Sequence, residues 1–149
     1  MISVIEIKKE LLSALKELYP KGYAFYGLEV TEGYAKPSFF TQLVPVSSET
    51  ETNRIKNRVF IYEITYFQET VNEIDALQKV SEIEGIFGVK VKIKDRYANV
   101  TEFDYDFIGK SRDILQVKIT FSFKDAIEQK AENHEPVRDV KVRTEGSVK

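Results

Sequence analysis

The sequence predicts an α+β domain with a mainly antiparallel sheet and two helices packed on one face of it. Three observations support this fold class. Apolar residues recur with helical spacing in two separate stretches, other stretches alternate between apolar and polar residues, and the stretches follow the order helix, strands, helix, strands. The length of 149 residues suits one domain whose core needs no disulfide.

The first helix is expected over residues 2–19, and Pro20 and Gly22 end its pattern. Its expected apolar stripe consists of Ile5, Leu11, Leu12, Leu15, Leu18 and Tyr19. A short aromatic strand is expected next, at residues 23–27.

Two long strands with a polar loop between them are expected over residues 37–67. The first, 37–46, has apolar residues on both faces, which predicts cover by a helix on one face and by a neighbouring subunit on the other. Pro45 has no N–H to donate, so it is expected at a sheet edge or a bulge. The polar loop covers 47–57, and the second strand covers 58–67.

The second helix is predicted from a start signal, an apolar stripe and an end signal. Thr70 and Glu73 have the spacing of a capping box, in which each side chain binds the backbone N–H of the other residue. The helix should end near Gly85 or Gly88. Its expected apolar stripe consists of Ile74, Leu77 and Val80.

Three further strands are expected at residues 89–94, 100–107 and 115–123, because apolar and polar residues alternate there. Lysines alternate along the first of them and carboxylates along the second. If these two strands form a hairpin, the lysines would face the carboxylates on its solvent side. After residue 125 the apolar pattern fades, so we expect a domain over 1–125 and a polar C-terminal tail or arm over 126–149.

Composition limits the chemistry of the chain. It has no cysteine, which excludes disulfides, thiolate metal sites and cysteine nucleophiles. The only histidine, His134, lies in the polar tail, where a zinc site or a catalytic triad is not expected. We expect no signal peptide, no membrane contact, no metal or other cofactor, and no enzymatic activity. A net charge of −2 gives no general attraction to nucleic acid.

Two clusters of charge are candidates for function. Glu102, Asp104 and Asp106 form either a salt-bridged surface, which we favour, or a carboxylate site for a metal. Every second position from 54 to 58 is basic: Arg54, Lys56 and Arg58. If this segment is extended, their side chains would project from the same face of it. They belong either to a solvated hairpin loop or to a protein–protein contact, where arginine is enriched.

Aromatic residues gather around the same strands, in numbers that exceed the needs of a sheet covered on one side. We expect about two thirds of them in the core, because only one face of the sheet meets the helices. They are Tyr23, Phe25, Tyr26, Phe39, Phe40, Phe60, Tyr62, Tyr66 and Phe67.

An ordered set of residues follows an amphipathic helix, precedes a capped helix and is concentrated in 32–67. It consists of Glu32-Gly33-Tyr34, Pro37, Phe39-Phe40, Leu43, Pro45-Val46-Ser47, Arg54, Lys56, Arg58, Ile64 and Tyr66-Phe67. This set resembles the tail terminator (tail completion) proteins of tailed phages and phage-like particles.

The resemblance implies a structural virion protein at the neck end of the tail, made and assembled in the host cytoplasm. It implies a hexameric ring that caps the tail tube, stops tube growth and receives the head-side connector or stopper protein. A sheath protein would be a further partner in a contractile tail, and genomic DNA would only pass through the lumen. The expected contact residues are Phe39, Phe40, Arg54, Lys56 and Arg58. Two alternatives stay open: another neck or tail-tube component, and a small metal- or ligand-binding domain that uses residues 102–106.

Overall fold

The computed structural model describes residues 1–127 apart from 28, 29 and 31. Within them, two helices and six strands follow one another along the chain: α1 (Val4–Leu18), β1 (Ala24–Tyr26), β2 (Ser38–Thr50), β3 (Ile55–Phe67), α2 (Glu73–Phe87), β4 (Lys90–Ile93), β5 (Arg96–Ile108) and β6 (Ile114–Ala126). The strands form one sheet in the order β1-β2-β3-β6-β5-β4. Only β1 and β2 are parallel; the other neighbours are antiparallel. The expected fold class is confirmed, while the expected tail lies almost wholly outside the described residues.

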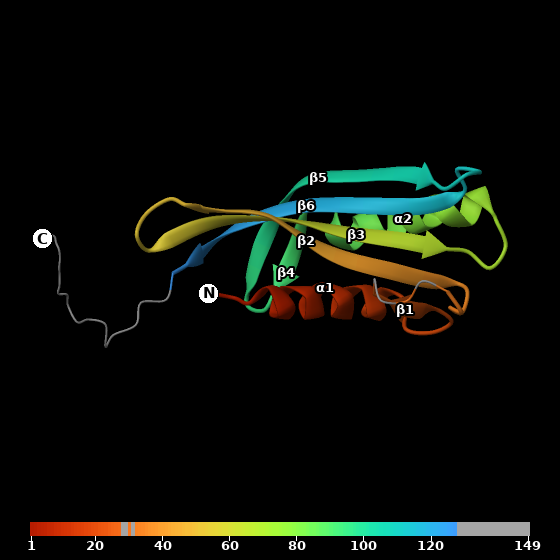
Figure 1. Cartoon of the computed structure of the whole chain (residues 1–149), viewed down its shortest axis with the longest axis horizontal. Helices are drawn as coiled ribbons and strands as arrows, with labels where there is room; N and C mark the ends of the chain where they lie inside the picture. Colours follow the sequence, from red (N-terminus) through yellow and green to blue (C-terminus); the bar gives the residue numbers. More distant parts are fainter. Residues whose placement is uncertain (28–29, 31, 128–149) are drawn as a thin grey trace, which may run out of the picture.

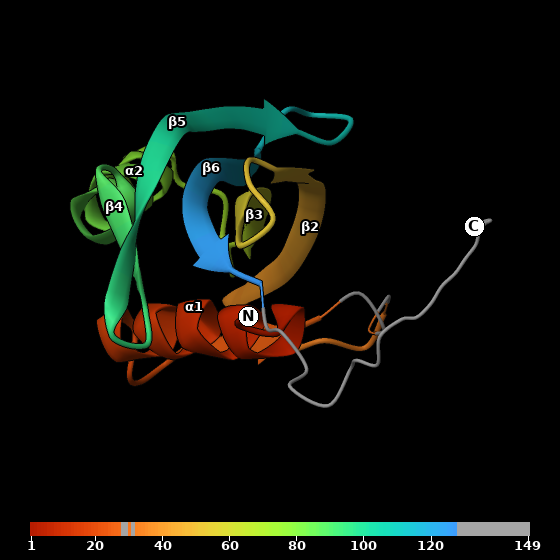
Figure 2. The ribbon, with the colours of Figure 1, turned by 90° about the vertical axis from the view of Figure 1, so that its left-hand side faces the viewer.

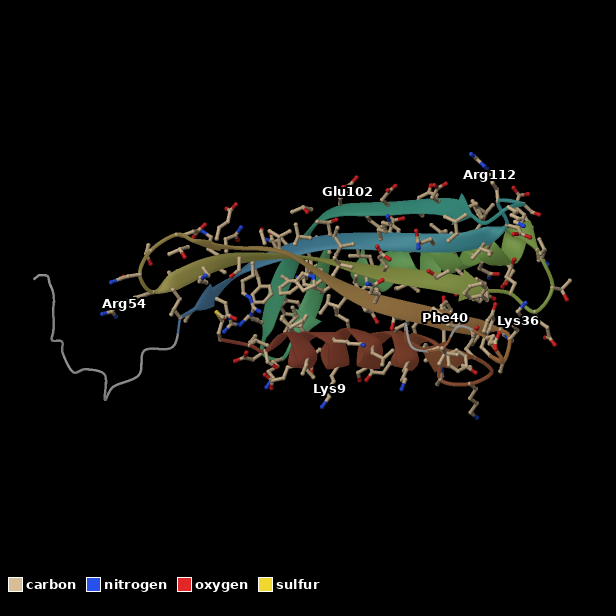
Figure 3. The ribbon with its side chains drawn as sticks, in the orientation of Figure 1. Lys9, Lys36, Phe40, Arg54, Glu102 and Arg112 are labelled. Atoms are coloured by element: carbon tan, nitrogen blue, oxygen red, sulfur yellow. The ribbon has the colours of Figure 1, made fainter. Side chains whose placement is uncertain are left out.

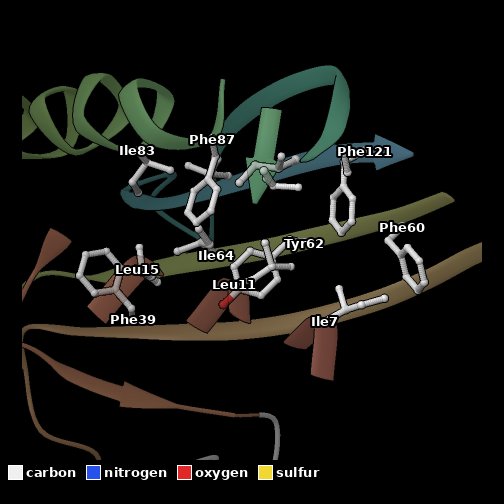
Figure 4. Packing of buried hydrophobic residues seen from close by; sticks show 14 of the residues in the cluster. Ile7, Leu11, Leu15, Phe39, Phe60, Tyr62, Ile64, Ile83, Phe87 and Phe121 are labelled. Atoms are coloured by element: carbon white, nitrogen blue, oxygen red, sulfur yellow. The ribbon is translucent and has the colours of Figure 1, made fainter. Parts of the chain in front are cut away.

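The sheet is curled, and both helices lie on its inner side (Figures 1 and 2). Buried residues alternate along β6 as predicted. Those on its inward face are Leu115, Val117, Ile119, Phe121 and Phe123. The same face of β3 buries Phe60, Tyr62, Ile64 and Tyr66. These side chains meet α1 and α2 in one core (Figure 4). Fully burying a large apolar side chain contributes about 1.5–3 kcal/mol, so this shared core holds the helices on the sheet.

Helix α1 begins at a capping box that the sequence prediction missed. The Ser3 hydroxyl accepts a hydrogen bond from the Glu6 N–H at 3.1 Å, and the Glu6 carboxylate accepts one from the Ser3 N–H at 3.3 Å. Its buried residues are Ile7, Leu11 and Leu15. The expectation that Ile5 belongs to the stripe was wrong, because this side chain points to solvent and is 67% exposed.

Helix α2 ends at Gly88, as expected, but it begins differently. Asn72 is its N-cap, with the side-chain oxygen accepting a hydrogen bond from the Asp75 N–H at 3.1 Å. The predicted box of Thr70 and Glu73 was therefore wrong, since asparagine is an equally good cap and lies closer to the helix.

The stripe of α2 also differs from the expected one. The buried residues are Ala76, Lys79, Val80, Ile83 and Phe87. Val80 was predicted correctly, whereas Ile74 and Leu77 are 70% and 42% exposed.

The pairing of β4 corrects the predicted hairpin of lysines and carboxylates. A short turn, with Lys94 at φ 58°, joins β4 to the start of β5. Residues 90–93 therefore pair with 96–99, and the carboxylates at 102–106 lie beyond the end of β4. They lie beside β6 instead, where Asp104 is opposite Lys118.

The polar loop was expected over residues 47–57, and this expected length was wrong. Strand β2 continues to Thr50 and β3 begins at Ile55, so the connection is only residues 51–54. The register shifts between Pro45 and Ser47, which confirms the expected bulge. Beyond this shift, residues 47–57 form an arm that extends past the helices beside the end of β6 (Figure 1). The arm is therefore built from paired strands.

Candidate interaction surfaces

The carboxylates of β5 form an exposed row. Glu102, Asp104 and Asp106 are all exposed, and Glu102 points away from the molecule in Figure 3. In the part of the chain that the structure describes, no group of three or more His, Cys, Asp or Glu residues could hold a metal ion. His134 lies outside the described residues. The row therefore has the geometry of a charged surface.

No helix in residues 1–27, 30 and 32–127 is long and apolar enough to span a membrane.

Phe39 and Phe40 lie on opposite faces of β2. Phe39 is completely buried and lies in the core against the rings of Tyr19 and Tyr66, with ring centroids 4.8 and 4.9 Å away. Phe40 lies on the outer face and is half-buried. Tyr34 and Phe67 cover part of it, with centroids 5.0 Å away in each case. The chain's own aromatic residues thus provide part of the cover that was expected from a neighbouring subunit.

The three basic residues in the arm and at its base do not project together, contrary to the prediction. Arg54 is exposed at the tip (Figure 3), and Lys56 is half-buried. Arg58 is only 5% exposed. The prediction required all three to lie in one extended segment, but Arg54 lies in the turn before β3. Arg58 lies on the inward face of the strand.

Arg58 belongs to an ion cluster at the base of the arm. Its Nη1 atom lies 3.0 Å from Oδ2 of Asp125, and Arg96 Nη1 lies 3.2 Å from Oδ1. The Ile2 N–H donates to Asp125 Oδ2 at 2.8 Å, and Arg58 donates to the Ile2 carbonyl at 2.6 Å. Burial alone would raise the pKa of Asp125, but these hydrogen bonds and cations outweigh it and lower the pKa. The cluster ties the start of the chain to β3, β5 and β6.

Lys79 is a buried cation that the sequence prediction did not identify. Its ammonium lies 5.2–5.5 Å from the ring centroids of Tyr19, Tyr23 and Tyr66, and 2.9 Å from Asp75 Oδ1. Burial alone would lower the pKa of Lys79, but its contacts with Tyr23 and Asp75 outweigh burial and raise it. The sequence signal was available: Ala76, Val80 and Ile83 define a stripe that also contains position 79.

The tyrosine hydroxyls complete this second cluster. Tyr66 donates a hydrogen bond to Asp75 Oδ2, and Tyr19 donates one to Glu82 Oε1, both at 2.7 Å. Burial and then the nearby carboxylates raise the pKa of both tyrosines. Both neutral hydroxyls therefore act as donors that hold α2 against α1 and β3.

Comparisons with known proteins agree with the sequence resemblance. A family model described as "Phage tail terminator protein" matches residues 6–133. A comparison with curated proteins found no match. One solved structure superposes with a TM-score of 0.51 at 11% identity, covering 87% of this chain and 99% of that one. At this identity the structural likeness shows the fold alone.

Proposed function

We propose a function from the premise that the family comparison establishes: the chain belongs to the phage tail terminator protein family. It is a structural protein of the phage tail. On this premise, the chain forms a ring, in the expected hexameric form, that caps the tail tube and ends its growth. The opposite side of the ring would receive the head-side connector or stopper protein. The single observation that carries the proposal is the family match, which spans most of the chain.

The distribution of side chains supports a role in assembly. The pockets among the described residues are open to solvent, and the carboxylates of the row are exposed. The exposed apolar side chains, in contrast, lie on several elements. They include Ile5 on α1, Val46 on β2 and Ile74 on α2. A subunit of a closed ring needs two different surfaces that fit each other, in addition to surfaces for the tube and the connector.

Within this proposal, the arm contacts the tube or a neighbouring subunit. Arg54 and Lys56 are the candidates for direct contact, while the burial of Phe39 and Arg58 gives these two residues a supporting role. Phe40, half-buried on the outer face, is a candidate for a contact at its remaining exposed edge. Genomic DNA passes through the lumen of the ring without specific binding.

The first test is the mass of the purified chain in solution and on tubes. We expect light scattering to give six times the chain mass, or imaging to show rings at the ends of purified tail tubes. A chain that stays monomeric and does not bind the ends of tail tubes would contradict the proposal.

The second test addresses the arm. The double variant Arg54→Ala/Lys56→Ala should fold with a stability within about 0.5 kcal/mol of wild type, because neither side chain forms an ion pair or hydrogen bond with the described residues and neither is fully buried. It should nevertheless cap tubes less efficiently in a tube-length assay. Lys110→Ala/Lys118→Ala, which removes two exposed lysines elsewhere, is the control. Normal capping by the arm variant would remove the arm from the contact surface.

A further inference from the structure

We infer that the copies in the ring join through their helices, with the outward face of α1 in one copy packed against the outward face of α2 in the next. This inference rests on the proposed ring and names the two surfaces that close it. Both helices bury one stripe against the sheet, and both leave apolar side chains exposed on the opposite side: Ile5 on α1, and Ile74 and Leu77 on α2.

The outward face of α1 is apolar and basic. Ile5 is exposed at its beginning, to 67%. Lys8, Lys9 and Lys16 are also exposed, and Lys9 points away from the sheet in Figure 3. On the flank of the helix, the Glu6 carboxylate forms an ion pair with Lys94 and so adds little free negative charge. Two further carboxylates lie on this helix: Glu10 is half-buried and accepts a hydrogen bond from the Lys94 N–H, and Glu17 is exposed. The three exposed lysines outnumber these two carboxylates, so a positive excess remains on α1.

The outward face of α2 is apolar and acidic. Ile74 and Leu77 are exposed, and so are Glu73 and Glu84. The one cation of this helix, Lys79, is buried and paired. The apolar surface continues before the helix, where Val71 is 65% exposed and borders an open hollow of about 210 Å³ with Ala76 and Phe107.

Gly85 is a second, independent indication of a partner on this face. It lies inside α2, where glycine costs roughly 0.5–1 kcal/mol relative to alanine. A Cβ at this position would meet no atom of the chain within 4 Å, and the backbone has no left-handed φ. The fold of the single chain therefore gives no reason for glycine here. With the exposed Ser81 one turn before it, Gly85 leaves the helix backbone open to close approach by another element.

Charge decides which surfaces meet. Two copies joined α1 to α1 would bring lysines together, and two copies joined α2 to α2 would bring glutamates together; each arrangement is unfavourable. Packing α1 on α2 places apolar residues at the centre and opposite charges around them, as in a specific interface. Such a contact uses two different surfaces, so it generates a ring when the rotation closes.

A charge-swap series tests this pairing in solution and in tube capping. Lys9→Glu/Lys16→Glu makes both helices acidic, and Glu73→Lys/Glu84→Lys makes both basic. Each double variant alone should self-associate about 100-fold more weakly than wild type, because like charges then meet at every junction. A 1:1 mixture should restore association, since an alternating ring pairs an acidic α1 with a basic α2 and a basic α1 with an acidic α2. The quadruple variant should associate by itself.

Matched controls separate the effect of the charges on α1 and α2 from the effect of the chain's net charge on association. Lys110→Glu/Lys118→Glu and Glu102→Lys/Asp104→Lys carry the same changes in charge on other exposed positions and should associate normally. Gly85→Gln adds a long side chain at the open position and should also weaken association. Normal association of both helix variants, or no restoration on mixing, would overturn the inference and leave the ring intact. If wild type itself neither associates nor caps tubes, the proposed function fails, and the inference fails with it.

Discussion

Asp125 illustrates how one side chain can hold three strands and the start of the chain together. Its two carboxylate oxygens accept from Ile2, Arg58 and Arg96. Sequence patterns placed Asp125 at the end of a strand but could not show these partners, because they are about 30, 70 and 120 positions away along the chain.

We predict that Asp125→Asn lowers the free energy of unfolding at pH 7 by about 3 kcal/mol, because the buried Arg58 loses its counter-ion. Wild type should lose the same contribution in acid. The folded-state pKa lies below the ordinary value of 3.8, so the stabilisation is present above that value and disappears as the pH falls through the folded-state pKa. Urea unfolding of both proteins from pH 7 downward measures this, and the two curves should converge at low pH. Asp104→Asn, on the exposed row, should leave the curve unchanged.

Lys79 provides a second prediction at this scale. Lys79→Met keeps the apolar stem but removes the cation from its tyrosine and aspartate partners. We expect a loss of about 2 kcal/mol, less than for a fully buried pair because Asp75 is partly exposed and can be solvated. Thermal or urea unfolding measures it, with the exposed Lys92→Met as the matched control. Equal stability of the two variants would show that the contacts of the Lys79 ammonium with its tyrosine and aspartate partners contribute nothing to the free energy of unfolding.

At the scale of elements, the sequence predicted which segments are helices and strands more reliably than their ends and faces. The alternation in β6 was unambiguous, and all five predicted inward residues are buried. Helix α2 was harder, since its exposed Ile74 and Leu77 mimic a core stripe and its buried face contains a lysine. An exposed apolar stripe cannot be distinguished from a core stripe by periodicity alone.

Substitutions in α2 can distinguish its buried face from its exposed apolar face. Ile83→Ala should cost about 3 kcal/mol, because Ile83 is completely buried and its truncation leaves a cavity. Ile74→Ala should change the stability of the monomer by less than about 0.5 kcal/mol, since its side chain is mostly in solvent. Urea unfolding at low protein concentration compares them. A large loss for Ile74→Ala would place this residue in the core, as the sequence suggested.

The glycines at the end of α2 give a matched pair with opposite expectations. Gly85→Ala should stabilise the chain by about 0.5–1 kcal/mol, because alanine favours a helix and nothing blocks its Cβ. Gly88→Ala should destabilise it, because the new Cβ would clash with the Glu84 carbonyl oxygen. Differential scanning calorimetry should therefore show melting temperatures that move in opposite directions.

At the scale of the whole molecule, the sequence predicted the layers but not the order of the strands. The lysine and carboxylate strands were expected to pair because they are neighbours in sequence and opposite in charge. The structure instead pairs the carboxylate strand with β6 along most of its length. The predicted pairing fails because β4 is too short: it has only four residues and cannot reach the carboxylates. The candidate contact residues were predicted from the family resemblance and from their residue types, and only the structure showed that Phe39 and Arg58 are buried.

The strand order has a consequence for how the chain is synthesised. The central pair of the sheet is β3 and β6, yet α2, β4 and β5 are translated between them. While the ribosome makes these segments, β3 has one unpaired edge and carries four aromatic residues without their final cover. Non-local pairings of this kind form slowly and leave the nascent chain prone to aggregation. The yield of folded protein during synthesis therefore depends on how soon β6 emerges from the ribosome and inserts beside β3.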